Sequence, residues 1–286
     1  MGFQGLAPLA RATENGQTWQ SFFFKTSAPF GTAARWYDAA IGAGTPVYQA
    51  YVGAQYEATQ LIGSGNRGIY TGPTPASGQT KHLFALSAGT STASVPLTLI
   101  LADYLMFYPL IDMDTLDQQD MIQTATLPRY TDGKGVQAYF VVSAPMTGNG
   151  TVTVTYTNSA GTANRSTTFG ITFSGTIGTI VNNSNSTLVA GAAAPFIPLA
   201  NGDLGIQSIQ SVTCNASMGG FCHVVLVKPL ATHLVREQNT ESETTFFKDK
   251  ANCTKIESGA YLNFVALNNT ATTFAPLRGF VQFNWN

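Results

Sequence analysis

The chain has 286 residues, a formal net charge of −1 and 10% charged residues, whereas charged residues make up about 25% of an average soluble domain. Its length suffices for one large domain or two, with a substantial hydrophobic core. The near-zero net charge creates no long-range field, so we expect no nucleic-acid partner and no membrane partner. Soluble monomeric proteins usually carry enough surface charge to prevent association with one another. The deficit therefore indicates a subunit of an assembly, or a protein that tolerates harsh solvent.

Residues 1 to about 30 are expected to form an extended N-terminal arm. No secretory signal is apparent in its first half, which is rich in Gly, Ala, Pro and Gln. The second half holds an aromatic run that includes Trp19, Phe22, Phe23 and Phe24, and large aromatic side chains are unfavourable when left in water. Two interpretations stay open: the run is an edge strand of the chain's own sheet, or it is an arm that docks on a neighbouring subunit.

The segment that follows is predicted to contain one short helix, at residues 32–41. Ala is the strongest helix former, and glycines at 42 and 44 end the pattern. Residues 45–94 are irregular, apart from a strand-like run at 81–87, and contain Tyr48, Tyr51 and Tyr56. Tyr provides contact area and a hydrogen bond at low entropic cost. We therefore expect residues 1–94 to be an arm followed by a Tyr-rich contact region.

The longest apolar run of the chain lies at residues 97–108. Asp103 interrupts it and Pro109 follows it, and it is shorter than the ~18–20 residues of a membrane-spanning helix, so we interpret it as a buried strand. Further runs rich in β-branched and aromatic residues follow at 136–143, 151–157, 166–173, 176–181, 206–214, 221–230, 261–267 and 279–285. The run at 151–157 alternates strictly between Thr and apolar residues, which is typical of a half-buried antiparallel strand.

This succession of short strands predicts a mainly β fold. We expect an antiparallel β-sandwich of jelly-roll type over residues 95–286, preceded by the arm and contact region. The one charge-dense stretch, at 236–257, is interpreted as an exposed loop around Phe246 and Phe247.

The tightest acidic cluster consists of Asp112, Asp114, Asp117 and Asp120. Closely spaced carboxylates suit Ca²⁺, but an EF-hand loop that begins at Asp112 would need Gly where Asp117 stands and Glu where Gln123 stands. The alternative interpretation is a solvated turn, or a short helix with Asp at its N-terminal end. The four residues remain weak metal candidates.

No other pattern in the sequence is typical of a chemical site. The odd number of cysteines argues for reduced thiols, the histidines lack a metal-binding spacing, and no nucleophile motif or phosphate-binding loop is present. The cysteines are Cys214, Cys222 and Cys253, and the histidines are His82, His223 and His233. We therefore predict no catalytic residue, no cofactor and no enzyme activity.

Six segments carry a likeness to a known group of proteins. They are ADYLMFYPLID at 102–112, LPRYTDGKGV at 127–136, YTNSAG at 156–161, IPLANGDLGI at 197–206, VLVKPL at 225–230 and YLNF at 261–264. Together they resemble virion structural proteins of tailed bacteriophages, most of which have no assigned role. The resemblance covers about residues 97–286 and includes no catalytic motif. It implies a virion component that is synthesised in the bacterial host cytoplasm.

These observations predict a capsid cement or decoration protein that binds the outside of the phage head. Its partners would be the major capsid protein and copies of itself, in a homo-oligomer for which analogy suggests a trimer. The expected contact residues are Trp19, Phe22, Phe23, Phe24, Tyr48, Tyr51 and Tyr56. The arm would act as a clamp whose removal leaves the sandwich folded. The alternatives are a collar, tail or spike component that binds the host, and a glycan-active enzyme on a jelly roll.

Overall fold

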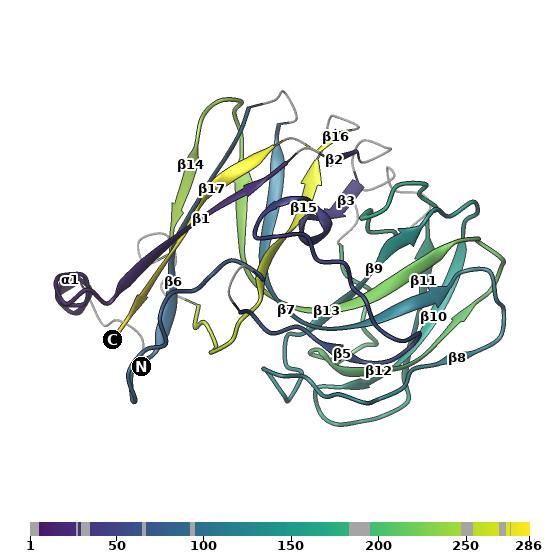
Figure 1. The fold of residues 1–286 in the computed structure, drawn as a ribbon. Coiled ribbons are helices and arrows are strands. Elements are labelled where there is room, and N and C mark those ends of the chain that lie inside the picture. Colours follow the sequence, from purple (N-terminus) through teal and green to yellow (C-terminus); the bar gives the residue numbers. More distant parts are fainter. Residues whose placement is uncertain are drawn as a thin grey trace.

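The structure is a computed structural model of the chain. It describes residues 6–26, 28–29, 35–64, 67–91, 95–182, 195–246, 254–268, 273–274 and 276–286. The fold is mainly β, and the sheets are antiparallel (Figure 1). Within the described residues, no helix is long and apolar enough to cross a membrane.

A six-stranded sheet forms the centre of the molecule. Its strands, in spatial order, are β3 (Arg35–Asp38), β15 (Leu262–Asn268), β7 (Leu97–Asp112), β13 (Phe221–Val235) and β9 (Gln137–Ala144), with β5 (Thr59–Gln60) paired to β7. The expected strand at 97–108 is confirmed and extends to Asp112. It pairs along its length with β13, and these two long strands cross the whole molecule (Figure 1).

Two further sheets lie at opposite ends of the central one (Figure 1). The first has the order β14 (Ser242–Thr245), β6 (Lys81–Thr90), β17 (Leu277–Trp285), β1 (Thr18–Lys25) and β4 (Gly44–Thr45). The second has the order β11 (Arg165–Ile171), β10 (Gly150–Asn158), β12 (Ile206–Cys214) and β8 (Gln119–Asp120). The remaining elements are the pair β2 (Ala28–Pro29) and β16 (Thr273–Phe274), helix α1 (Leu6–Glu14) and the 3₁₀ turn η1 (Ala39–Ile41).

The two outer sheets pack on one face of the central sheet, so two sandwiches share it. Leu97, Leu99 and Leu101 of β7 belong to a core with side chains of β6 and β17, whereas Leu105 and Tyr108 belong to a core with side chains of β10 and β12. Leu97, Leu99, Leu101 and Leu105 lie on the same side of the strand, because side chains alternate along it. The β7–β13 register is irregular between Tyr104 and Met106, where β7 has one extra residue, and beyond this bulge Met106 and Tyr108 face the same core as Leu105. The predicted β-sandwich is confirmed, and a jelly-roll strand order is not.

The opposite face of the central sheet is covered by the chain between β3 and β5. A third apolar core lies here, with aromatic side chains from β7, β9 and the covering segment. Tyr51 of that segment is buried against Phe107 of β7, with ring centroids 5.1 Å apart. The Tyr-rich region after residue 45 therefore folds onto its own sheet along part of its length.

Most strands expected from the sequence are present, as β6, β9, β10, β11, β12, β13, β15 and β17. The strict alternation at 151–157 is confirmed, because Val152, Val154 and Tyr156 are fully buried while the intervening threonines are half-buried. The run expected at 176–181 is not a strand. It is a turn followed by isolated bridges at Thr179 and Ile180.

The helix predicted at 32–41 is wrong over its described residues. Residues 32–34 lie outside the described part of the chain, Arg35–Asp38 form strand β3, and only Ala39–Ile41 form one 3₁₀ turn. All four residues of β3 are buried and pair with β15. Pairing with a distant strand has overridden the helix propensity of the alanines.

The extended N-terminal arm is also corrected. Helix α1 occupies Leu6–Glu14, and β1 lies between β17 and β4 inside a sheet. Strands from before residue 94 pair with strands from after it in two sheets: β6 and β1 pair with β17 in one, and β3 pairs with β15 in the other. The expected boundary at 94 is therefore not a structural boundary. The charge-dense stretch at 236–257 likewise contains β14 and the buried Phe246, while Phe247 lies outside the described residues.

Candidate functional site

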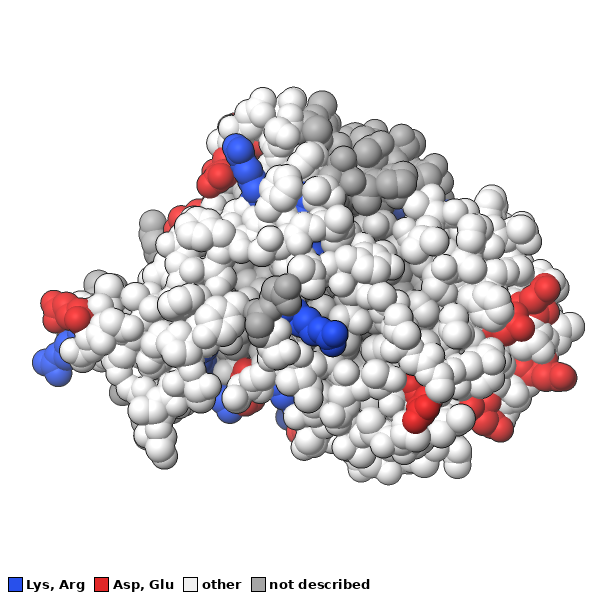
Figure 2. Space-filling model, in the orientation of Figure 1, with Lys and Arg blue, Asp and Glu red and all other residues white. Residues whose placement is uncertain are grey.

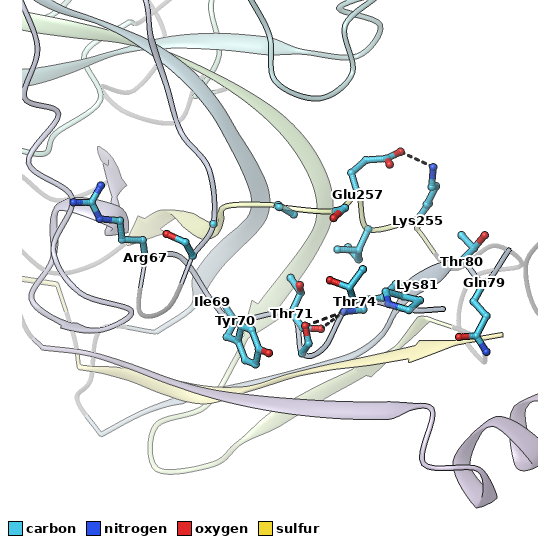
Figure 3. A pocket seen from close by; sticks show the side chains of 18 residues that line it. Arg67, Ile69, Tyr70, Thr71, Thr74, Gln79, Thr80, Lys81, Lys255 and Glu257 are labelled. Carbon is cyan, nitrogen blue, oxygen red and sulfur yellow. Dashed lines mark hydrogen bonds and ion pairs between the residues drawn. The ribbon is translucent and has the colours of Figure 1, made fainter. Parts of the chain in front are cut away.

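A cavity of about 350 Å³ opens between the chain at 63–81 and the chain at 255–260 (Figure 3). Lys255 and Glu257 project from one side, Tyr70, Thr71, Thr74 and Lys81 line the other, and Arg67 lies apart from Gln79 and Thr80 at the far end (Figure 3). Its lining is rich in hydroxyl, amide and charged side chains and includes one exposed aromatic ring, that of Tyr70. We refer to it as the 63–81/255–260 cavity.

Lys81 fixes one wall of this cavity. Its Nζ donates hydrogen bonds to the carbonyl oxygens of Thr71 at 2.6 Å, Gly72 at 3.2 Å and Pro73 at 2.7 Å. The ammonium also lies 5.1 Å from the ring centroid of Trp285, a cation–π contact. Burial lowers the pKa of Lys81 to about 8. Because three carbonyls use all three donors of the ammonium, Lys81 holds the loop rather than offering a free charge.

Tyr70 is held from behind by strand β1. The Trp19 ring contacts the Tyr70 ring at 5.5 Å with the ring planes nearly perpendicular, and Ser21 Oγ donates to the Tyr70 carbonyl. Trp19 packs directly on Gly72, which has a φ of +82°, and a Cβ at that position would collide with the indole. Only Gly meets both requirements without strain.

The charged side chains at the cavity differ in whether they form ion pairs. Lys255 and Glu257 form an ion pair at 2.8 Å, whereas Arg67 makes no ion pair with the residues that the structure describes. The backbone of Arg67 is nevertheless fixed, since its N–H donates to the Ser64 carbonyl at 2.9 Å. Gln79 Oε1 accepts from the Ala76 N–H at 2.9 Å, which leaves its NH₂ group for another partner.

A second candidate surface is the outer side of β1 and β17. Phe22 and Phe24 of β1 are 70% and 46% exposed. Phe22 lies opposite the half-buried Phe280 of β17, with ring centroids 6.2 Å apart. Charged side chains are sparse on the molecular face in Figure 2, where the acidic groups collect mainly toward one end. We refer to Phe22, Phe24 and Phe280 as the aromatic sheet face.

The seven predicted contact residues differ in their exposure to solvent. Phe22, Phe24 and Tyr48 are exposed, Trp19 is partly exposed behind Tyr70, and Tyr56 is half-buried. Phe23 and Tyr51 are buried in the chain's own cores and present no area to a partner. Phe23 points inward because the side chains of β1 alternate between the two sides of the sheet.

A buried tyrosine–carboxylate network was not predicted from the sequence. Asp38 is fully buried, and its carboxylate accepts from the hydroxyls of Tyr51 at 2.6 Å, Tyr104 at 2.8 Å and Tyr139 at 3.0 Å. The Ala40 N–H donates to the same carboxylate at 2.9 Å. Burial raises the pKa of Asp38, and these hydrogen bonds act in the opposite direction. With no solvent-exposed surface, the network joins β3, β7, β9 and the covering segment from inside.

A buried ion pair joins the segments at 102–112 and 127–136. Arg129 donates to both carboxylate oxygens of Asp103, at 2.8 and 2.7 Å. The guanidinium also donates to the carbonyls of Leu61 and Tyr104, and the Tyr261 N–H donates to Asp103. Burying an ion pair is tolerated when such hydrogen bonds satisfy both partners. These residues therefore serve the fold.

Three of the four acidic metal candidates accept hydrogen bonds from other groups of the chain. Asp112 accepts from the Asp114 N–H at 2.9 Å, Asp120 accepts from Gln118 at 2.7 Å, and Asp114 accepts from Ser217. Asp117 is exposed. Among the described residues, no group of three or more His, Cys, Asp or Glu side chains is placed to hold a metal ion. The solvated-turn interpretation of this segment fits these contacts.

The cysteines and histidines are placed inside the structure. Cys214 and Cys222 are free and buried, and Cys253 lies outside the described residues. His82 is buried on β6, and His223 and His233 are both buried on β13. His233 lies between the hydroxyls of Thr244 and Ser242, at 2.9 and 2.8 Å, so it connects β13 with β14.

Comparison with known proteins adds no relative: no family model, no curated protein and no solved structure matches this chain.

Proposed function

We propose that this chain is a structural protein of a tailed-bacteriophage virion that binds the outer surface of the head as a cement or decoration protein. The observation that carries the proposal is the aromatic sheet face, formed by Phe22, Phe24 and Phe280 on one side of β1 and β17. The low content of charged residues and the six sequence segments that resemble virion proteins support the same assignment.

The aromatic sheet face has the composition of a protein contact surface. The outward positions of β1 and β17 that flank the three phenylalanines are occupied by Gln20, Gln282 and Arg278. Arg278 lies 3.7 Å from Glu241 in an exposed ion pair. Protein interfaces combine a desolvated aromatic centre with a polar rim. Burying an exposed Phe side chain contributes roughly 1.5–3 kcal/mol, and that contribution would recur with every copy bound to the shell.

The position of β1 makes this surface rigid before binding. β1 pairs with β17 over its whole length and with β4 at its end, and its inward side chains Phe23 and Lys25 are buried. A preformed surface loses little conformational entropy on association. The proposed docking element is thus a strand inside a sheet. The sequence had instead suggested an extended arm that could be removed without unfolding the sandwich.

Binding to capsids assembled without this chain tests the proposal. We expect the double variant Phe22→Ser with Phe24→Ser to fold as the parent does, because both side chains point to solvent, and to lose capsid binding in a co-sedimentation assay. Leu204→Ser is the matched control, since Leu204 is also an exposed apolar residue but lies in the segment before β12. Undiminished binding by the double variant would contradict the assignment of this surface.

A further inference from the structure

We propose that the 63–81/255–260 cavity binds an acidic saccharide, namely one or two pyranose units that carry a carboxylate. This site is separate from the aromatic sheet face, because Phe22 and Phe24 point outward from β1 whereas Trp19, which supports Tyr70, lies toward the inward side of the same strand. The proposal does not depend on capsid binding.

The walls of the cavity are fixed without a ligand. The Gly63 N–H donates to the Gly259 carbonyl at 2.9 Å and the Ile69 N–H to the Leu262 carbonyl at 2.8 Å, so the two segments are joined directly. A Cβ at position 63 would collide with the Ala260 carbonyl, which shows how closely they approach. The three carbonyl contacts of Lys81 hold the opposite wall. Preorganised sites of this kind bind small ligands at a lower entropic cost.

The charge at the cavity favours an anion. Arg67, Lys81 and Lys255 are cationic and Glu257 is the one acidic residue of the described lining. Lys255 is compensated by Glu257, and the ammonium of Lys81 is saturated by carbonyls. Arg67 is left at the end of the cavity as the cation without an ion pair among the described residues, and its guanidinium points away from the other labelled side chains in Figure 3. A planar guanidinium matches a carboxylate in a bidentate arrangement, so the carboxylate of the ligand would lie at this end.

The rest of the lining favours a sugar ring over other anions. Tyr70 is 49% exposed and presents an aromatic ring that Trp19 holds in place, and such a ring gives a sugar an apolar surface beside a polar one. Hydroxyl and amide groups surround it, from Ser64, Thr71, Thr74, Gln79, Thr80 and Ser258. The volume of about 350 Å³ lies at the lower end of the ~300–1,000 Å³ range of small-ligand sites, which suits one or two sugar units.

The test measures binding of defined saccharides to the full chain by two-dimensional ¹H–¹⁵N NMR and by calorimetry. The acidic probes are digalacturonic acid, glucuronic acid and N-acetylneuraminic acid, the neutral probe is galactobiose, and adenosine monophosphate is the non-saccharide anion. We expect at least one acidic saccharide to shift the amide signals of Gly63, Tyr70 and Glu257, and to bind about tenfold more tightly than galactobiose because of the contact with Arg67.

Four variants locate the binding. Arg67→Gln is expected to abolish the preference for the acidic over the neutral saccharide, and Tyr70→Ala to weaken both by about tenfold. Tyr70→Phe keeps the ring and is expected to bind as the parent does, as is Tyr48→Ala, which removes an exposed tyrosine outside the cavity lining. The proposal is overturned if no acidic saccharide shifts these amides, if Arg67→Gln keeps the preference, or if adenosine monophosphate binds more tightly than every saccharide.

Discussion

Asp38 shows how one residue can join elements that are distant in the sequence. Its carboxylate accepts hydrogen bonds from the hydroxyls of three tyrosines and from a backbone N–H, and a fully buried carboxylate requires such donors. No local pattern marked it, because Asp38 stands in an alanine-rich stretch that favours a helix and the tyrosines lie up to 101 residues away. Such a network becomes apparent only when the fold brings these residues together.

His223 gives a residue-scale prediction about acid. It is buried on β13, its Nδ1 accepts from the Leu110 N–H at 3.2 Å, and burial lowers its pKa to about 4. The usual value in an unfolded chain is about 6.5. Between pH 6.5 and pH 4 the unfolded chain therefore takes up a proton that the folded chain does not. The free energy of unfolding should fall as the pH falls through this window.

The variant His223→Asn isolates that contribution, because Asn Oδ1 can still accept from the Leu110 N–H but does not titrate. Urea unfolding at pH 7.5 and pH 4.5 should show that the parent loses about 2–3 kcal/mol more than the variant between the two pH values. The difference between the proteins removes the shared titration of the carboxylates. Equal losses in the two proteins would show that His223 already titrates normally in the fold.

At the scale of elements, the long strands were predictable and the short ones were not. β7, β10 and β13 carry their own signal, because each is long, apolar or alternating, and bounded by turn residues. β3 and β14 have four residues each and exist because β15 and β6 lie beside them. The cavity was missed for the same reason, since its two segments are separated by more than half of the sequence.

Strand β1 gives an element-scale prediction. Removing residues 1–25 would expose the paired edge of β17 and empty the position of Lys25, whose Nζ donates to the Gly42 and Pro46 carbonyls at 3.0 and 2.7 Å. We expect this truncation to lose cooperative thermal unfolding, followed by circular dichroism. Removing residues 1–14 deletes α1 alone and serves as the control that keeps the transition. A cooperative transition in the longer truncation would show that β1 is dispensable.

At the scale of the whole molecule, one central sheet serves two sandwiches. Asp103 of β7 lies between Leu101, which faces one sandwich, and Leu105, which faces the other, and Arg129 neutralises it there. This ion pair therefore ties the segment at 127–136 to β7 at the junction of the two sandwiches. The aromatic sheet face lies on the sandwich that contains β1 and β17, so under the proposed function this sandwich would contact the shell.

The copy number of this chain in purified virions, measured by quantitative mass spectrometry against the major capsid protein, tests the central claim most directly. A cement protein on the head surface predicts about one copy per capsid subunit or about one per three, as expected for units at the symmetry axes of a shell. A ratio of a few per cent would contradict head binding and indicate a collar, tail or spike component. Absence from the virion would contradict a structural role altogether.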